Sequence, residues 1–159
     1  MTLESLKRKA IRAIDRHADW VVATSREIER EPETGFRETR AARRVAEFFS
    51  SNGIEHQAGL AITGVNGWLR GRESSATVAI IGELDALVLP EHPYSNPSTH
   101  AAHACGHRAQ VAAMLGAGLG LLEVRGQLDG DIVLFATPAE EVAELDRRLG
   151  LRKVASSNS

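Results

Sequence analysis

Apolar residues recur every three or four positions along the first 30 residues, which is the spacing that places them on one face of an α-helix. These residues are Leu3, Leu6, Ala10, Ile14, Ala18, Val21 and Ile28. The pattern predicts a helix over residues 2–30, which ends before Pro32 and Gly35. A second amphipathic helix is predicted over residues 37–51.

The pattern then changes to short apolar segments separated by glycines, which are typical of β-strands. These segments cover residues 54–56, 60–65 and 68–70. Residues 77–81 are a continuous apolar run, the kind found in strands that are buried on both faces of a sheet, and residues 131–136 are predicted as another buried strand.

A helix is predicted between these two runs, over residues 108–124, and a last helix over residues 140–149. Gly116 and Gly120 share one face of the first of these helices, so another element can pack closely there. Strand, helix and strand form a β-α-β unit, whose two strands are parallel. The predicted fold class is therefore α/β, with three α/β/α layers and helices on both faces of a mostly parallel sheet.

Polar residues gather just after the two buried strands and before the helix between them. They are Glu83 and Asp85, then His103, Cys105 and His107, and finally Glu140 and Glu141. In open α/β sheets, sites form at this edge. Thiolate, imidazole and carboxylate together are ligands for a transition metal, with zinc as the default. One of two adjacent carboxylates can bind the metal while the other takes a proton from water.

Each group also has a simpler interpretation. A cysteine at a helix start is commonly a small buried apolar residue, and paired glutamates at a helix start favour the helix dipole. Glu83 and Asp85 are also compatible with a turn or a cap. A further loop group, Glu91, His92 and His100, is interpreted as solvated.

The composition narrows the classes of function. The chain has 159 residues, which suggests one domain, and its net charge of −2 does not favour binding to nucleic acid. The longest apolar run, residues 111–122, is shorter than a membrane span. A single cysteine cannot form an internal disulfide, and we therefore expect a cytoplasmic protein.

Four motifs resemble one family. They are Pro-Glu-Thr-Gly-Phe-Arg-Glu at 32–38, Gly-Glu-Leu-Asp-Ala-Leu at 82–87, His-Ala-Cys-Gly-His at 103–107 and Pro-Ala-Glu-Glu at 138–141. In this order they resemble the metal-dependent amidohydrolases of the aminoacylase and carboxypeptidase clan. The branch that includes aminobenzoyl-glutamate, hippurate and auxin-conjugate hydrolases is the most similar, from about residue 10 to about residue 150.

The resemblance implies a role for five residues. Cys105, His107 and Glu141 match metal ligands, and Glu140 matches the general base that activates water and later protonates the leaving amine. Asp85 matches the carboxylate that orients the ligands. The implied cofactor is a divalent metal, zinc or manganese, which is dinuclear in the family. The implied reaction is hydrolysis of the amide bond of a small N-acyl amino acid or an aminobenzoyl-glutamate-like substrate.

The sequence departs from the family in several places. Glu83 lies where other branches have a ligand histidine, His103 is interpreted as structural, and Arg108 introduces a cation beside the expected metals. No histidine follows His107, so the further histidine ligands and the lid domain of the family are not expected here. The resemblance implies that residues 1–151 are the N-terminal part of a catalytic metal-binding domain and that residues 152–159 are a disordered tail.

Three hypotheses follow for the function. The chain is the impaired catalytic part of an amidohydrolase, or a non-catalytic α/β interaction module, or a site that is completed by a second polypeptide or another subunit. Histidines further downstream would favour the first hypothesis, and a stability independent of metal would favour the second. Co-purification with a partner would favour the third.

Overall fold

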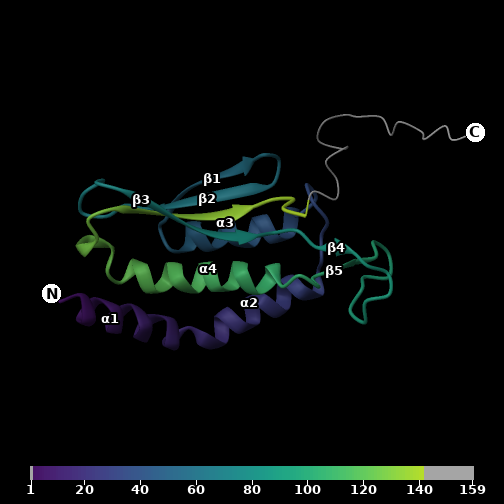
Figure 1. The fold of residues 1–159 in the computed structure, drawn as a ribbon, viewed down its shortest axis with the longest axis horizontal. Helices are drawn as coiled ribbons and strands as arrows, with labels where there is room; N and C mark the ends of the chain where they lie inside the picture. Colours follow the sequence, from purple (N-terminus) through teal and green to yellow (C-terminus); the bar gives the residue numbers. More distant parts are fainter. Residues whose placement is uncertain (1, 142–159) are drawn as a thin grey trace, which may run out of the picture.

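The computed structural model describes residues 2–141 (Figure 1). Its helices are α1 (Leu3–Arg16), α2 (Ala18–Arg30), α3 (Thr39–Ser51), α4 (His107–Leu122) and the short 3-10 helix η1 (Arg125–Gln127). Its strands are β1 (Glu55–Leu60), β2 (Gly64–Leu69), β3 (Thr77–Glu83), β4 (Leu87–Val88), β5 (Ala101–Ala102) and β6 (Asp131–Thr137). The predicted α/β class is confirmed.

The main sheet is mixed, with the strand order β1-β2-β6-β3. β3 and β6 are parallel, as the predicted β-α-β unit requires. β1 and β2 are antiparallel because a short turn joins them, and β2 is also antiparallel to β6. Within the described residues the sheet is therefore mixed and not mostly parallel. The predicted segments 54–56, 60–65 and 68–70 are in fact two strands, and the middle segment was wrong because residues 61–63 form the hairpin turn, with Ala61 and Ile62 at positive φ.

Helices α3 and α4 both pack on the same face of the sheet. Gly67 of β2 and Leu134 of β6 are directly paired, so they point to the same side. Phe49 of α3 packs on Gly67, and Gly118 of α4 packs on Leu134. Below α4, α1 and α2 form a second helical layer (Figure 1). Among residues 2–141, helices thus cover one face in two layers, whereas helices on both faces were predicted.

Small residues on α4 allow these layers to approach closely. A Cβ atom at Gly116 would lie 3.1 Å from Val21 of α2, and one at Gly120 would lie 3.0 Å from the carbonyl oxygen of Ala10 in α1. The predicted close packing on this glycine face is therefore confirmed. Trp20 of α2 stacks on Phe48 of α3 with a centroid distance of 5.3 Å, which ties the two helical layers together.

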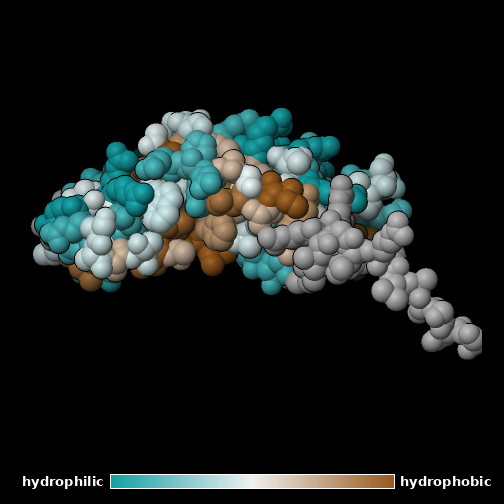
Figure 2. Space-filling model, turned by 90° about the horizontal axis from the view of Figure 1, so that it is seen from above, coloured by the Kyte–Doolittle hydropathy of each residue, from teal (hydrophilic) through white to brown (hydrophobic). Residues whose placement is uncertain are grey.

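The other face of the sheet carries apolar side chains that the described residues leave partly exposed. Ile81 of β3 is 55% exposed on this face. Ile81 pairs with Phe135, and Trp68 pairs with Val133 on the same face. A view from above Figure 1 shows apolar side chains gathered among polar ones on the surface (Figure 2). Among residues 2–141, the prediction that residues 77–81 are buried on both faces is wrong, because β3 is an edge strand and no described helix covers the face that carries Ile81.

The first predicted helix is two helices. It breaks at His17, whose φ of −111° and ψ of 11° lie outside the helical range. Apolar periodicity continues across this single residue, and so the sequence pattern did not reveal the break. None of the described helices is long and apolar enough to cross a membrane. The predicted tail, and all of the predicted helix 140–149 after Glu141, lie outside the described residues.

Candidate metal centre

The parallel pairing of β3 and β6 brings the three polar groups together. Glu83, the last residue of β3, pairs with Thr137, the last residue of β6, so both strands end at the same edge of the sheet. The N–H of Leu84 donates a 2.9 Å hydrogen bond to the carbonyl of Thr137 and extends this pairing by one residue. α4 begins at His107 at this edge.

Gly106 allows the sharp turn between Cys105 and His107. Its φ is +96°, a left-handed conformation that costs a residue with a side chain about 1–2 kcal/mol. No atom lies within 4 Å of the position that a Cβ atom would occupy, so backbone strain and not crowding selects glycine here.

His107 is at the centre of the site and is only 2% exposed. Its Nδ1 lies 2.9 Å from the main-chain carbonyl oxygen of Asp85. Its Nε2 faces three carboxylates: Glu83 at 2.9 Å, and Glu140 and Glu141 at 3.8 Å each. Because a carbonyl oxygen only accepts hydrogen bonds, Nδ1 is the ring nitrogen placed to donate to Asp85, and Nε2 is the ring nitrogen that faces the carboxylates.

Asp85 links the histidine to the strand-end loop that follows β6. Its side chain is 2% exposed, and Oδ2 accepts a 3.0 Å hydrogen bond from the backbone N–H of Glu141. Oδ1 lies 3.2 Å from Nδ1 of His107 but makes no hydrogen bond among the described residues. Asp85 therefore fixes the orientation of His107 and the position of Glu141.

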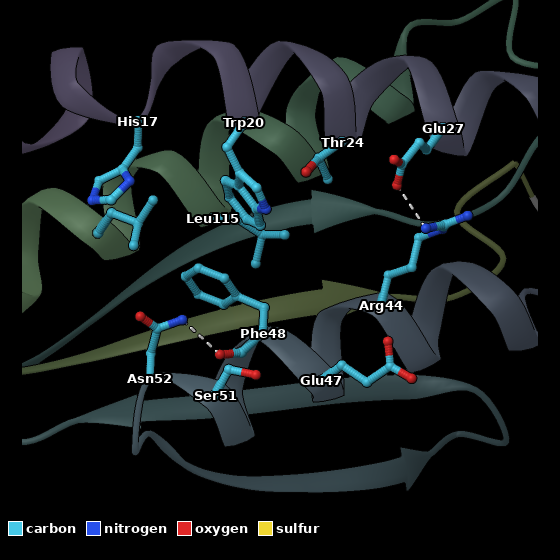
Figure 3. Close-up of a pocket in the computed structure, with 11 residues that line it drawn as sticks. His17, Trp20, Thr24, Glu27, Arg44, Glu47, Phe48, Ser51, Asn52 and Leu115 are labelled. Carbon is cyan, nitrogen blue, oxygen red and sulfur yellow. Dashed lines mark hydrogen bonds and ion pairs between the residues drawn. The ribbon is translucent and has the colours of Figure 1, made fainter.

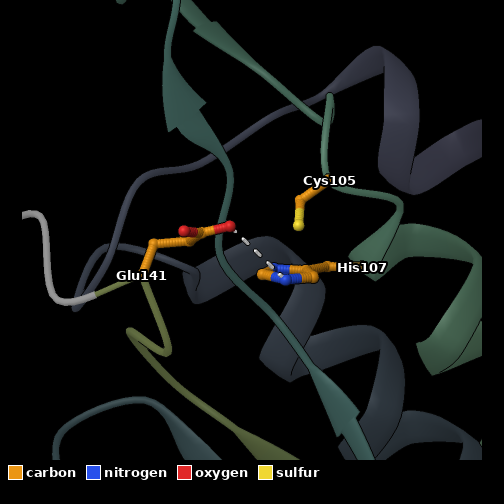
Figure 4. Close-up of side chains that lie close together, drawn as sticks. All are labelled: Cys105, His107 and Glu141. Carbon is orange, nitrogen blue, oxygen red and sulfur yellow. Dashed lines mark ion pairs between the residues drawn. The ribbon is translucent and has the colours of Figure 1, made fainter.

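Three side chains lie close together at this edge: Cys105 and His107 from just before and at the start of α4, and Glu141 from the loop after β6 (Figure 4). One possible ligand atom from each lies within 4.8 Å of the others. A hydrogen bond from the Cys105 thiol to Glu141, together with the charge of that carboxylate, raises the pKa of Cys105 above its usual value. Cys105 is the exposed residue of this group, whereas His107 is buried.

A second group of three shares the same histidine. Ligand atoms of Glu83, His107 and Glu140 also lie within 4.8 Å of one another. Glu83 is partly buried, and the Glu140 side chain is 48% exposed. The sequence did not assign Glu83 a role, and the structure places it in direct contact with His107.

The segment before α3 makes a hydrogen bond to the turn that carries Glu140 and Glu141. Oε1 of Glu38 accepts a 2.8 Å hydrogen bond from the N–H of Ala139, the residue before Glu140. The carboxylate of Glu33 accepts hydrogen bonds from the N–H groups of Arg40 and Ala41 at the start of α3. The motif that contains both glutamates was recognised in the sequence without this supporting role, and the partner of Glu38 lies 101 positions away.

Other candidate residues lie outside the two groups. Burial, with the charges of His107 and Arg108, lowers the pKa of His103 to about 4, so this side chain is a neutral packing residue near neutral pH. Arg108 turns away toward α2, where Nε pairs with Glu29 at 2.9 Å and NH1 donates to Ser25. The expectation that it is a cation beside the metals is therefore corrected. His92 and His100 belong to neither group.

A separate hollow of about 360 Å³ lies between α2, α3 and α4 (Figure 3). Its lining includes the stacked Trp20 and Phe48, and Arg44 pairs with Glu27 at its rim at 2.7 Å. None of the candidate metal-site residues lines it.

Two curated relatives are similar over most of this chain. Thermostable carboxypeptidase 2 from Saccharolobus solfataricus is 34% identical over 127 residues, which are 77% of this chain and 32% of the relative. IAA-amino acid hydrolase ILR1-like 2 from Arabidopsis thaliana is 35% identical over 126 residues, which are 77% of this chain and 28% of the relative. The chain thus spans about a third of the length of these relatives. No protein-family model matches it.

The fold agrees with the sequence comparison. The crystal structure of Bacillus subtilis YXEP, described as a dinuclear metal-binding peptidase, matches with a TM-score of 0.72 and 26% identity, over 85% of this chain and 39% of that chain. Imidazole, thiolate and carboxylate are ligand types that metal hydrolases use. The chain belongs to the M20 family of amidohydrolases and peptidases.

Proposed function

We propose that the chain binds a divalent metal through Cys105, His107 and Glu141 and forms part of a hydrolase that cleaves the amide bond of N-acyl amino acids. The observation that carries this proposal is the buried imidazole of His107. Its Nδ1 faces the Asp85 carbonyl at 2.9 Å, and its Nε2 faces the carboxylates of Glu83 and Glu141 at 2.9 and 3.8 Å. A lone pair that faces carboxylate oxygens requires a cation among them, either a proton on the ring or a metal ion.

The surrounding residues fit such an ion. Thiolate, imidazole and carboxylate are ligands that zinc accepts, and manganese accepts the nitrogen and oxygen ligands. The backbone hydrogen bond from His107 to Asp85 fixes the ring with Nε2 free, the arrangement that commonly orients ligand histidines. When bound, the metal supplies Lewis-acid chemistry to a substrate carbonyl.

Two carboxylates have different parts in the proposed reaction. Glu140 is the proposed general base: its half-exposed carboxylate takes a proton from the attacking water and gives it to the departing amine nitrogen. Asp85 is the proposed orienting residue, because its carboxylate holds the backbone N–H of Glu141 and its carbonyl contacts His107.

The substrate class rests on the relatives. One of them is named a carboxypeptidase and another an IAA-amino acid hydrolase. We therefore propose a small N-acyl amino acid as the substrate and zinc or manganese as the metal. We also propose that residues 1–151 belong to one catalytic metal-binding domain, and that the protein acts in the cytoplasm.

A second candidate is a site that a second polypeptide or another subunit completes. The observation that favours it is the open face of the sheet, where Ile81 is exposed and Trp68, Val133 and Phe135 are only partly buried. A partner that covers this face would bury apolar surface and could add ligands at the nearby strand ends. Light scattering with metal and substrate present would separate the two candidates.

The test is hydrolysis of N-acetyl amino acids by the zinc-loaded and manganese-loaded chain and by Glu140→Gln. The proposal expects turnover by the wild type and at least about a hundredfold less by Glu140→Gln, with metal still bound, since general-base catalysis contributes roughly 10²–10⁴-fold. Glu91→Gln, in the exposed loop, is the matched control. Equal turnover by Glu140→Gln would overturn the assigned base.

A further inference from the structure

The hollow between α2, α3 and α4 has the size and the mixed lining of a small-molecule site. Its volume of about 360 Å³ lies within the range of about 300–1,000 Å³ that is typical of ligand pockets. Its apolar part consists of four side chains: Leu115, Leu119, Trp20 and Phe48. None of the candidate metal-site residues lines the hollow, so a molecule bound there lies outside the proposed metal centre.

Trp20 gives this hollow an accessible aromatic ring. The ring stacks on Phe48 with a centroid distance of 5.3 Å and an interplanar angle of 26°, and Trp20 is still 40% exposed. Figure 3 shows the two rings between Asn52 on one side and Glu27 on the other. The face of an aromatic ring attracts a cation, and tryptophan does so more strongly than the other aromatic side chains. The lining therefore suits a ligand that is both apolar and positively charged.

The charged side chains in and around the hollow favour a cation as well. Arg44 lines the hollow, but its guanidinium is already paired with Glu27 at 2.7 Å and with Glu31 at 3.0 Å. Glu47 adds another carboxylate to the lining, which is 66% exposed and lies 3.7 Å from Arg43. Three carboxylates thus stand against two guanidiniums, and this balance disfavours an anionic ligand.

The uncharged polar groups of the hollow can accept hydrogen bonds. Thr24 is only 7% exposed, and none of the hydrogen bonds within residues 2–141 involves its hydroxyl. Asn52 uses its amide nitrogen for a 2.8 Å hydrogen bond to the carbonyl of Phe48, which leaves its side-chain oxygen as an acceptor. His17 also lines the hollow and accepts a hydrogen bond when it is neutral. A buried hydroxyl without a partner is costly, and a bound donor removes that cost.

We propose that this hollow binds an organic ammonium ion with an apolar body, of the arylalkylamine class. The apolar body packs against Trp20 and the leucines of α4. The ammonium group donates a hydrogen bond to the hydroxyl of Thr24, in the field of the surrounding carboxylates. This is a second binding site of the chain, and it does not depend on a metal in the proposed metal centre.

The test compares 2-phenylethylamine with 3-phenylpropionate, which share a phenyl group and a two-carbon linker but carry opposite charges. Titration calorimetry on the full chain without metal is expected to show the amine binding at least about tenfold more tightly than the acid. Thr24→Val keeps the shape of the side chain without its hydroxyl and should weaken the amine at least about threefold. Glu47→Gln, on the exposed rim, should weaken it about twofold or more. Glu91→Gln, in the exposed loop, is the matched control.

The outcomes decide both the site and its ligand class. Tighter binding of the amine, weakened by Thr24→Val and by Glu47→Gln but not by the control, supports the proposal. Binding of the acid that is as tight as that of the amine overturns the ligand class. Amine binding that is unchanged in both variants, or a wild-type chain that binds neither compound at millimolar concentration, overturns the site. None of these results bears on the metal centre, because no metal is present in the titrations.

Discussion

The carboxylate of Glu38 accepts a hydrogen bond from the backbone N–H of Ala139 at 2.8 Å, across 101 positions of the chain. Its other oxygen accepts a 2.5 Å hydrogen bond from the hydroxyl of Thr63. Ala139 has a φ of 51°, a left-handed conformation, and is followed at once by Glu140 and Glu141. Glu38 therefore holds the strained turn that presents both glutamates to the metal site.

The first prediction concerns Glu38, whose side chain is fully buried and whose pKa is raised by this burial. Glu38→Ala leaves the Ala139 N–H and the Thr63 hydroxyl without their partner, so the free energy of unfolding should fall by roughly 2 kcal/mol or more. Glu38→Gln keeps an oxygen for Ala139 and avoids a buried charge, and should lose less. Urea unfolding measures both. Equal stability of Glu38→Ala and the wild type would contradict the supporting role.

The second prediction concerns Gly106. Gly106→Ala forces a side chain into φ +96° and should lower the free energy of unfolding by about 1–2 kcal/mol. Because His107 follows directly, the Zn²⁺ affinity should fall too. The matched control is Gly126→Ala, at a glycine of η1 where a Cβ atom also meets nothing within 4 Å but φ is not left-handed. If both variants lose the same stability, backbone strain at Gly106 is refuted.

The third prediction concerns pH and Asp131. The N–H of Gly71, the guanidinium of Arg70 and the hydroxyl of Ser74 donate to its carboxylate and hold the pKa of Asp131 below its usual range. Because the folded pKa is below the unfolded one, this stabilisation is complete above the unfolded pKa and is lost as the pH falls through the folded pKa.

Asp131→Asn should therefore reduce the loss of stability between about pH 5 and pH 2. Thermal unfolding of the variant and the wild type across this range measures the effect. An acid dependence identical in both proteins would show that Asp131 carries none of it.

The fourth prediction concerns Arg108, which pairs with Glu29 at 2.9 Å and donates to Ser25. Both partners belong to α2. Arg108→Ala should therefore lower the free energy of unfolding by no more than about 1 kcal/mol, because the ion pair is about a third exposed. The metal affinity should change by less than about threefold, because the guanidinium points away from the site. A large rise in metal affinity would instead place this cation close to the ion.

The sequence predicted the polar edge because parallel strands end together, and alternate residues of an extended chain share a side. Glu83 and Asp85 do both contact His107, one at each ring nitrogen. The turn of Arg108 toward Glu29 could not be predicted, because it depends on how α2 lies against α4. The exposure of Ile81 depends likewise on which elements cover β3, and apolar periodicity contains no such information.

The supporting role of Glu38 escaped the sequence for a related reason. Its partners, Thr63 and Ala139, are 25 and 101 positions away, and no local pattern signals a contact over that separation. Local patterns thus predict helices, strands and strand ends, whereas the long-range contacts that position the ligands become visible only in the fold.

The measurement that tests the metal centre most directly is elemental analysis of the purified chain, beside Cys105→Ser and the control Glu91→Gln. Cys105 is exposed, so its replacement should leave the core intact. The account predicts bound zinc in the wild type and in the control, and a clear loss of zinc in Cys105→Ser. Little metal in the wild type after exposure to Zn²⁺, or the same zinc content in all three proteins, would contradict it.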